Sequence, residues 1–183
     1  MNTAAHQDRG SRFVPWDIKV ARINFGANCG PIAFATATEH EVCRVMQFFT
    51  HFEEKPWTTL THMRTAFAMA GFEPETLRQT WPERGVALIQ WLGPWSQRDF
   101  FSRWSLFHTH WIAVDGDWVF DHTELCWMKK EEWAREVAPL FLQETRHATG
   151  WAVKYGVTSK RSIWSESNAC SGVSTGDTFS FSG

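Results

Sequence analysis

Three residues that lie far apart in the sequence, Cys29, His110 and Asp121, are of the types that together perform nucleophilic catalysis. Cys29 is followed by Gly30 and Pro31, and proline favours the first turn of a helix because its missing N–H has no intrahelical use there. Unpaired N–H groups at a helix N-terminus stabilise a thiolate, which is the nucleophilic form of cysteine. A cysteine at a helix start can also be simply a small buried residue, so Cys29 alone is weak evidence for catalysis.

The same helix start predicts an oxyanion hole. Backbone N–H groups there point to the place where a negatively charged oxygen forms during attack on a carbonyl group. Asn24 and Asn28 lie just upstream of Cys29, and the side-chain amide of either could supply a second donor. A substrate backbone could approach closely at Gly30 because glycine has no side chain.

A hairpin should place His110 beside Asp121. Two β-rich runs flank Asp115-Gly116, one of the strongest signals for a two-residue hairpin loop. With these residues as the loop, the cross-strand pairs are Val114 with Asp117, Ile112 with Val119, and His110 with Asp121. Residues paired in this way share a face, with Cβ atoms roughly 4.5–5.5 Å apart. The carboxylate can then orient the imidazole, which leaves one ring nitrogen to take a proton from a thiol.

Two other interpretations of these residues compete with a catalytic triad. His110 and Asp121 could form an ordinary cross-strand polar pair, and only their combination with Cys29 favours catalysis. A zinc site could instead use thiol and imidazole ligands, taken from His108, His110, His122 and Cys126. The predicted register opposes this site, because His122 would pair with Thr109 and point to the opposite face from His110. We therefore predict that the site needs no metal and no cofactor.

The spacing of apolar residues predicts the elements that position this site. Residues 13–25 should be irregular or extended, and strands are expected over 72–81, in the hairpin that ends at Asp121, and over 151–157. Helices are expected over 30–37, 39–50, 59–71, 82–92 and 129–147. The second helix would start with a Thr38-x-x-Glu41 capping box, and the last would be kinked or divided at Pro139. Several helices followed by a small antiparallel sheet indicate an α+β fold.

Length and composition limit the function classes. The 183 residues fit one domain, predicted over 13–157 between a disordered N-terminus, 1–12, and a flexible Ser/Gly/Thr-rich tail, 158–183. A net charge of −2 without a basic block gives no reason to expect a nucleic-acid partner. No apolar run has the length of a signal peptide or a membrane span, so we expect a cytoplasmic protein without a membrane partner. The irregular spacing of the four cysteines predicts free thiols.

The motif from Asn28 to Ala33 (NCGPIA), the later motif from His110 to Val114 (HWIAV) and Asp121 resemble the papain-like peptidases of the bacteriocin-leader-processing (C39-like) type. The pattern is most similar to small papain-like proteins of bacteriophages and plasmids, over about residues 22–157. The resemblance implies a papain-like fold with N-terminal helices on a small antiparallel sheet. It also implies that Cys29 is the nucleophile, His110 the general base and acid, and Asp121 the orienting residue.

The chain departs from this family at one position. Such proteins carry a glutamine about six residues before the cysteine, whereas this chain has Ile23 there and Asn24 as the nearest amide. We expect an enzyme that cleaves a peptide or isopeptide in a protein substrate through a thioester, with an amine or thiol acceptor giving acyl transfer instead of hydrolysis. The tail that ends at Gly183 could be a substrate of its own domain. The alternative is a catalytically idle fold that captures a host protein.

Overall fold

The structure is a computed structural model that describes residues 12–52, 54–96 and 108–161. Its centre is a six-stranded sheet in the order β1-β6-β2-β3-β4-β5, in which every pair of neighbouring strands is antiparallel. The strands are β1 (Phe72–Arg78), β2 (Arg84–Leu92), β3 (Thr109–Asp115), β4 (Trp118–Asp121), β5 (Cys126–Lys129) and β6 (Gly150–Arg161).

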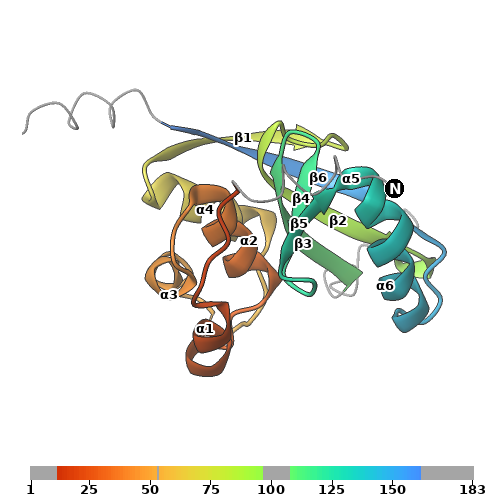
Figure 1. The fold of residues 1–183 in the computed structure, drawn as a ribbon, viewed down its shortest axis with the longest axis horizontal. Helices are drawn as coiled ribbons and strands as arrows, with labels where there is room; N and C mark the ends of the chain where they lie inside the picture. Colours follow the sequence, from red (N-terminus) through yellow and green to blue (C-terminus); the bar gives the residue numbers. More distant parts are fainter. Residues whose placement is uncertain (1–11, 53, 97–107, 162–183) are drawn as a thin grey trace, which may run out of the picture.

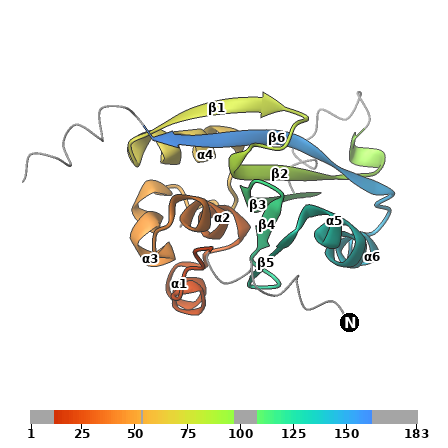
Figure 2. The same cartoon turned by 45° about the horizontal axis from the view of Figure 1, so that its top comes forward.

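Helices lie on both sides of this sheet (Figures 1 and 2). One group precedes the strands and contains α1 (Ile18–Phe25), α2 (Cys29–Thr38), α3 (Val42–Val45), the 3₁₀ turn η3 (Met46–Phe48) and α4 (Leu60–Met69). The other group contains α5 (Lys130–Glu132), the π-helical segment η6 (Trp133–Val137) and α6 (Ala138–Glu144), and the short turn η4 (Pro94–Ser96) follows β2. The α+β class is confirmed, and within the described residues no helix has the length and apolar character needed to cross a membrane.

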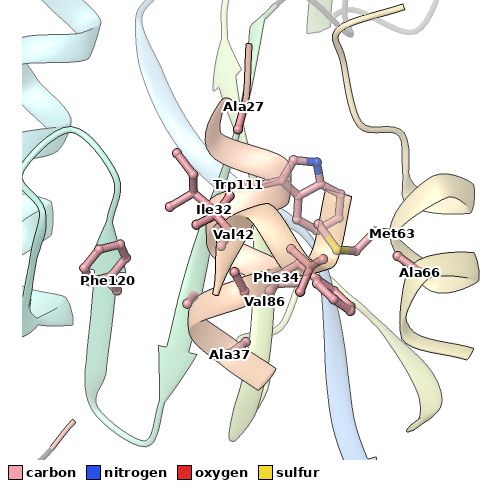
Figure 3. Packing of buried hydrophobic residues seen from close by; sticks show 14 of the residues in the cluster. Ala27, Ile32, Phe34, Ala37, Val42, Met63, Ala66, Val86, Trp111 and Phe120 are labelled. Atoms are coloured by element: carbon pink, nitrogen blue, oxygen red, sulfur yellow. The ribbon is translucent and has the colours of Figure 1, made fainter. Parts of the chain in front are cut away.

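Two hydrophobic clusters fill the space on either side of the sheet. The larger lies between the first helix group and the strands, where Phe34, Trp111 and Phe120 are almost fully buried (Figure 3). Every residue of α2 after Cys29 is buried, as expected of a central helix that is apolar all round. The smaller cluster packs Trp133 and Val137 against β2, β3 and β4. The N-terminus of α2 is therefore held rigidly against the strands that carry His110 and Asp121.

Residues 82–92 form the central strand β2, so the helix predicted there is wrong. Seven consecutive residues of β2 are buried, and a strand covered on both faces loses the alternation that would distinguish it from a buried helix. Gly85 lets β2 approach β6 closely. Its φ of 143° and the close approach of the Val157 carbonyl oxygen, 2.0 Å from the position of an added Cβ, leave room for glycine alone.

The first helix group also differs from the prediction. Residues 18–25 form α1 instead of an irregular segment, and the predicted helix over 39–50 is reduced to α3 and η3. The capping box is absent, because Thr38 ends α2 and its hydroxyl donates to the Phe34 carbonyl (2.8 Å). The carboxylate of Asp17 caps α3 instead, accepting from the N–H groups of Val42 and Cys43 at 2.9 and 2.8 Å. A cap supplied from so far along the chain leaves no local pattern in the sequence.

The domain boundaries extend beyond the predicted ones at both ends. Arg12, expected in a disordered terminus, forms an ion pair with Asp115 (3.1 Å) and lies over the ring of Trp118. Strand β6 continues to Arg161, so the first residues assigned to the tail pair with β1. Residues 1–11 and 162–183, which hold the rest of the predicted terminus and tail, lie outside the described residues.

Candidate active site

Cys29 is the first residue of α2, as the Cys-Gly-Pro motif predicts. Asn28 is the N-cap, and its side-chain oxygen accepts a hydrogen bond from the Gly30 N–H (3.2 Å). The Cys29 N–H has no acceptor within the helix, since the first N–H groups of any α-helix lack one. The helix start therefore presents a thiol and an adjacent backbone donor, which is the local geometry that attack on a carbonyl group requires.

The hairpin that carries His110 and Asp121 has a different register from the predicted one. Its loop is Gly116-Asp117, and the observed pairs include Val114 with Val119 and Asp115 with Trp118. Only Gly116 of the two loop residues has a positive φ, 56°. This suits a loop with glycine in its first position, whereas the predicted loop Asp115-Gly116 needs a positive φ at both residues.

His110 and Asp121 still meet despite this change. The register is displaced by two residues, so His110 and Asp121 are diagonal neighbours on one face instead of direct partners. The Nε2 atom of His110 lies 3.0 Å from Oδ2 of Asp121. His110 is 5 % exposed and Asp121 is fully buried, which protects their hydrogen bond from competition by water.

Asp121 is held by several donors besides His110. Trp133 Nε1–H donates to Oδ2 (2.8 Å), and the Thr123 N–H donates to Oδ1 (2.9 Å). Burial by itself would raise the pKa of Asp121, but the hydrogen bond from His110, the nearby His122 ring and the charge on His110 hold that pKa well below its usual range. The side chain is therefore a carboxylate at neutral pH, and His110 Nε2 carries the proton that they share.

The other partner of the imidazole is Cys29. Burial would lower the pKa of His110, but the hydrogen bond and charge of Asp121, with a smaller effect of the Cys29 side chain, raise it to about 10. Since Nε2 faces Asp121, Nδ1 is the nitrogen available to the thiol. Asp121 and Cys29 therefore both favour the protonated form of the buried imidazole. The three side chains come from α2, β3 and β4.

The Asn28 side chain has structural contacts at both ends of its amide. One N–H donates to the Pro56 carbonyl (2.7 Å) and the oxygen caps α2, while the second N–H of the amide leaves its part in the oxyanion hole a prediction. Asn24 is exposed in the last turn of α1, and its participation in the oxyanion hole stays a prediction. The Cys29 N–H is the donor that the helix itself offers.

Gly30 has a packing role that the sequence did not reveal. A Cβ at this position would lie 2.2 Å from the Thr58 hydroxyl oxygen, so Gly30 lets the segment before α4 approach the helix start. Trp111 Nε1–H donates to the Thr58 carbonyl (2.8 Å) and fixes the same segment to β3. The expectation that Gly30 admits a substrate backbone is therefore replaced by close contact with Thr58.

One group of described residues has the composition of a metal site: His110, Asp121 and His122 offer ligand atoms within 4.8 Å of one another. The prediction that His122 faces away from His110 is wrong, because β4 ends at Asp121 and the turn that follows brings the two rings to 5.1 Å. Of the predicted zinc ligands, His108 stacks on Trp95 (3.7 Å), whereas Cys126 starts β5. An ion at the observed group would have to displace the hydrogen bond between His110 and Asp121.

No protein-family model, curated protein or solved structure matches the chain. The geometry of Cys29, His110 and Asp121 and the motifs that surround them are therefore the basis for a function.

Proposed function

We propose that the protein is a cysteine hydrolase of papain-like fold that cleaves a peptide or isopeptide bond. The observation that carries this proposal is that the buried His110 imidazole, hydrogen-bonded to Asp121 at 3.0 Å, is also within the electrostatic influence of the Cys29 side chain. Three separate elements contribute one member each, and the nucleophile is the one placed at a helix N-terminus. An ordinary polar pair on a hairpin would have no need of a thiol beside the second imidazole nitrogen.

The geometry suits a thioester mechanism. The Cys29 thiolate attacks the substrate carbonyl carbon, and the Cys29 N–H stabilises the negative charge that develops on its oxygen. The C–N bond then breaks as the His110 imidazolium gives its Nδ1 proton to the leaving amine. Water adds to the thioester, His110 takes the water proton, and the C–S bond breaks to release the acid. Asp121 keeps its charge throughout and holds the ring in one tautomer.

An amine or thiol acceptor in place of water would make the protein an acyltransferase with the same first step. The unassigned second oxyanion donor favours a different alternative, in which the papain-like fold binds a host protein without turnover. The two classes differ in one property of the free protein. A catalytic Cys29 depends on His110 for its reactivity, whereas the thiol of a binding protein does not.

Alkylation by iodoacetamide measures this property, and Cys43 serves as an internal control. Burial, a hydrogen bond to Asp17 and the charges of Asp17 and Glu41 raise the pKa of Cys43 to about 11. At pH 7 only on the order of 10⁻⁴ of this thiol is ionised. The raised pKa of Cys43 makes this thiol about 100-fold less ionised than an ordinary thiol of pKa 9.0, so we expect a catalytic Cys29 to react well over 100-fold faster than Cys43 by peptide mass mapping. The His110→Ala protein should lose the excess over that factor, and a Cys29 rate that does not depend on His110 would refute the proposal.

A further inference from the structure

The Asp121 carboxylate is fixed by a residue outside the triad, the buried indole of Trp133. We propose that Trp133 is a positioning residue, whose Nε1–H holds Oδ2 of Asp121 in line with His110. This inference rests on the proposed function, because it assigns Trp133 a part in keeping the His110 imidazolium beside Cys29.

The hydrogen-bond pattern of Asp121 supports this role. Oδ2 accepts from Trp133 Nε1 at 2.8 Å and from His110 Nε2 at 3.0 Å, while Oδ1 accepts from the Thr123 backbone. Donors on both oxygens stop the carboxylate from rotating about its Cβ–Cγ bond. Without the indole N–H, His110 would be the only donor of these three on Oδ2, and rotation of the carboxylate would allow the imidazole to turn with it.

The backbone that presents Trp133 is unusual. Trp133 begins the π-helical segment η6, which separates α5 from α6, and π-helical turns are rare and concentrate at functional sites. Pro139 lies in the first turn of α6, where it cannot donate the N–H that a continuous α-helix would need. The wider turn before it directs Trp133 toward β4, so the local irregularity has an identifiable consequence at Asp121.

The packing of Trp133 leaves the indole little freedom. Its side chain is fully buried, it stacks on Trp91 with centroids 6.4 Å apart, and its edge meets Trp151 at 5.2 Å. Phe141, from the following helix, lies 4.9 Å from the His110 ring. The aromatic cluster of the smaller core therefore fixes the donor that holds Asp121, and it also covers the imidazole.

Replacement of Trp133 by phenylalanine tests the inference, with Trp127→Phe as a matched control. Trp127 is buried as well, and its Nε1–H donates at the same distance, 2.8 Å, to the Phe13 carbonyl in the larger core. In both variants a phenyl ring replaces the larger indole, and one indole hydrogen bond is lost. Both should therefore unfold at lower urea concentration than the wild type. Only Trp133→Phe should slow alkylation of Cys29 at pH 7, by about tenfold, since one hydrogen bond to a charged group is worth about that factor.

The pH profile separates a positioning role from a loss of packing. In Trp133→Phe the acid limb of the Cys29 alkylation rate should move to higher pH, because a carboxylate that can rotate no longer holds the His110 imidazolium where it favours the Cys29 thiolate. Trp127→Phe should keep the wild-type profile. Equal rates and profiles in the two variants would overturn the inference, whereas a Cys29 alkylation rate that is the same in the wild type and in His110→Ala would overturn the proposed function instead.

A measurement that leaves Trp133 in place covers the case in which Trp133→Phe does not fold. The indole N–H resonance of Trp133 should shift on His110→Ala, because both groups share Oδ2 of Asp121, and the resonance of Trp127 should stay in place. An unshifted Trp133 signal would contradict the shared hydrogen bond and with it the inference.

Discussion

Replacing Asp121 by asparagine should remove most of the pH dependence that His110 gives to the stability of the fold. His110 is protonated more readily in the folded chain than in the unfolded one, because its pKa is raised to about 10 in the native structure. A raised pKa contributes stability that is fully present below the unfolded value and is lost as the pH rises through the folded value. The wild-type protein should therefore lose stability between about pH 6.5 and pH 10.

The size of this loss follows from the displacement of the pKa. A change from 6.5 to about 10 is about 3.5 units, and at 1.36 kcal/mol per unit the upper bound is about 5 kcal/mol. Asp121 is the partner whose hydrogen bond raises the His110 pKa most. An asparagine side chain has no charge, so the fall in stability over this pH range should shrink to a minor part of that value.

Asparagine also fits the carboxylate site poorly. Its single oxygen can accept from His110 and Trp133 at the Oδ2 position, which places its NH₂ group against the Thr123 N–H. Two facing donors leave one bond unmade in a buried site, at a cost of about 1–3 kcal/mol at every pH. The variant should thus be less stable than the wild type near pH 6 and should approach it near pH 9.5.

Urea unfolding at intervals from pH 6 to pH 9.5 measures both effects. The comparison needs a Cys43→Ser background, because the raised pKa of Cys43, about 11, makes its own contribution above pH 9. In that background the wild-type free energy of unfolding should fall steadily with pH, and the Asp121→Asn curve should be nearly flat. Parallel curves for the two proteins would refute the reasoning, since they would show that Asp121 does not control the protonation of His110.

Two further predictions concern the start of α2. Gly30→Ala should destabilise the fold by about 1–3 kcal/mol in urea unfolding, because the added Cβ would overlap the Thr58 hydroxyl. The control is Gly150→Ala, which should change stability much less, because its Cβ would meet only Leu92 at an ordinary 3.8 Å. Asn28→Ala should lower the free energy of unfolding by about 1–2 kcal/mol, since it removes the cap on Gly30 and the hydrogen bond to Pro56. The control is Asn24→Ala, which changes an exposed side chain and should leave stability nearly unchanged. A stable Gly30→Ala protein, or equal stabilities of the two asparagine variants, would contradict the packing described for this helix start.

The elements that the sequence predicts correctly are those with a local cause. The start of α2 follows from Cys29-Gly30-Pro31, and α4 has Thr59 as its N-cap, bonded to the His62 N–H. Strand β6 contains the alternating segment from Trp151 to Val157. The errors have a tertiary cause. Strand β2 is buried on both faces, and α3 is capped by Asp17 from a distant part of the chain, so neither leaves a signal that a sequence window can detect.

The pair His110 and Asp121 shows why a wrong register can still predict the right neighbours. Side chains on a strand alternate between faces, so a displacement of one residue would have placed His110 and Asp121 on opposite sides of the sheet. The actual displacement is two residues, which preserves the face and changes only the distance along the strand. Diagonal neighbours are within reach of an imidazole and a carboxylate, as the 3.0 Å hydrogen bond demonstrates.

The same alternation fails for His122, and the reason lies at the end of β4. The pleat fixes the direction of a side chain only while the residue is paired, and β4 stops at Asp121. In the turn that follows, His122 comes within 3.5 Å of Asp121 Oδ1, and Thr123 donates its N–H to the same oxygen. The carboxylate therefore accepts hydrogen bonds from His110 on the neighbouring strand and from Thr123 in the turn. Its third donor, Trp133, lies in a helical segment outside the hairpin, so the hairpin register cannot predict it. A strand end thus lets one carboxylate accept from donors in three directions. Sequence spacing places His110 beside Asp121 but misses Trp133, because the indole reaches Asp121 from a helix in another layer.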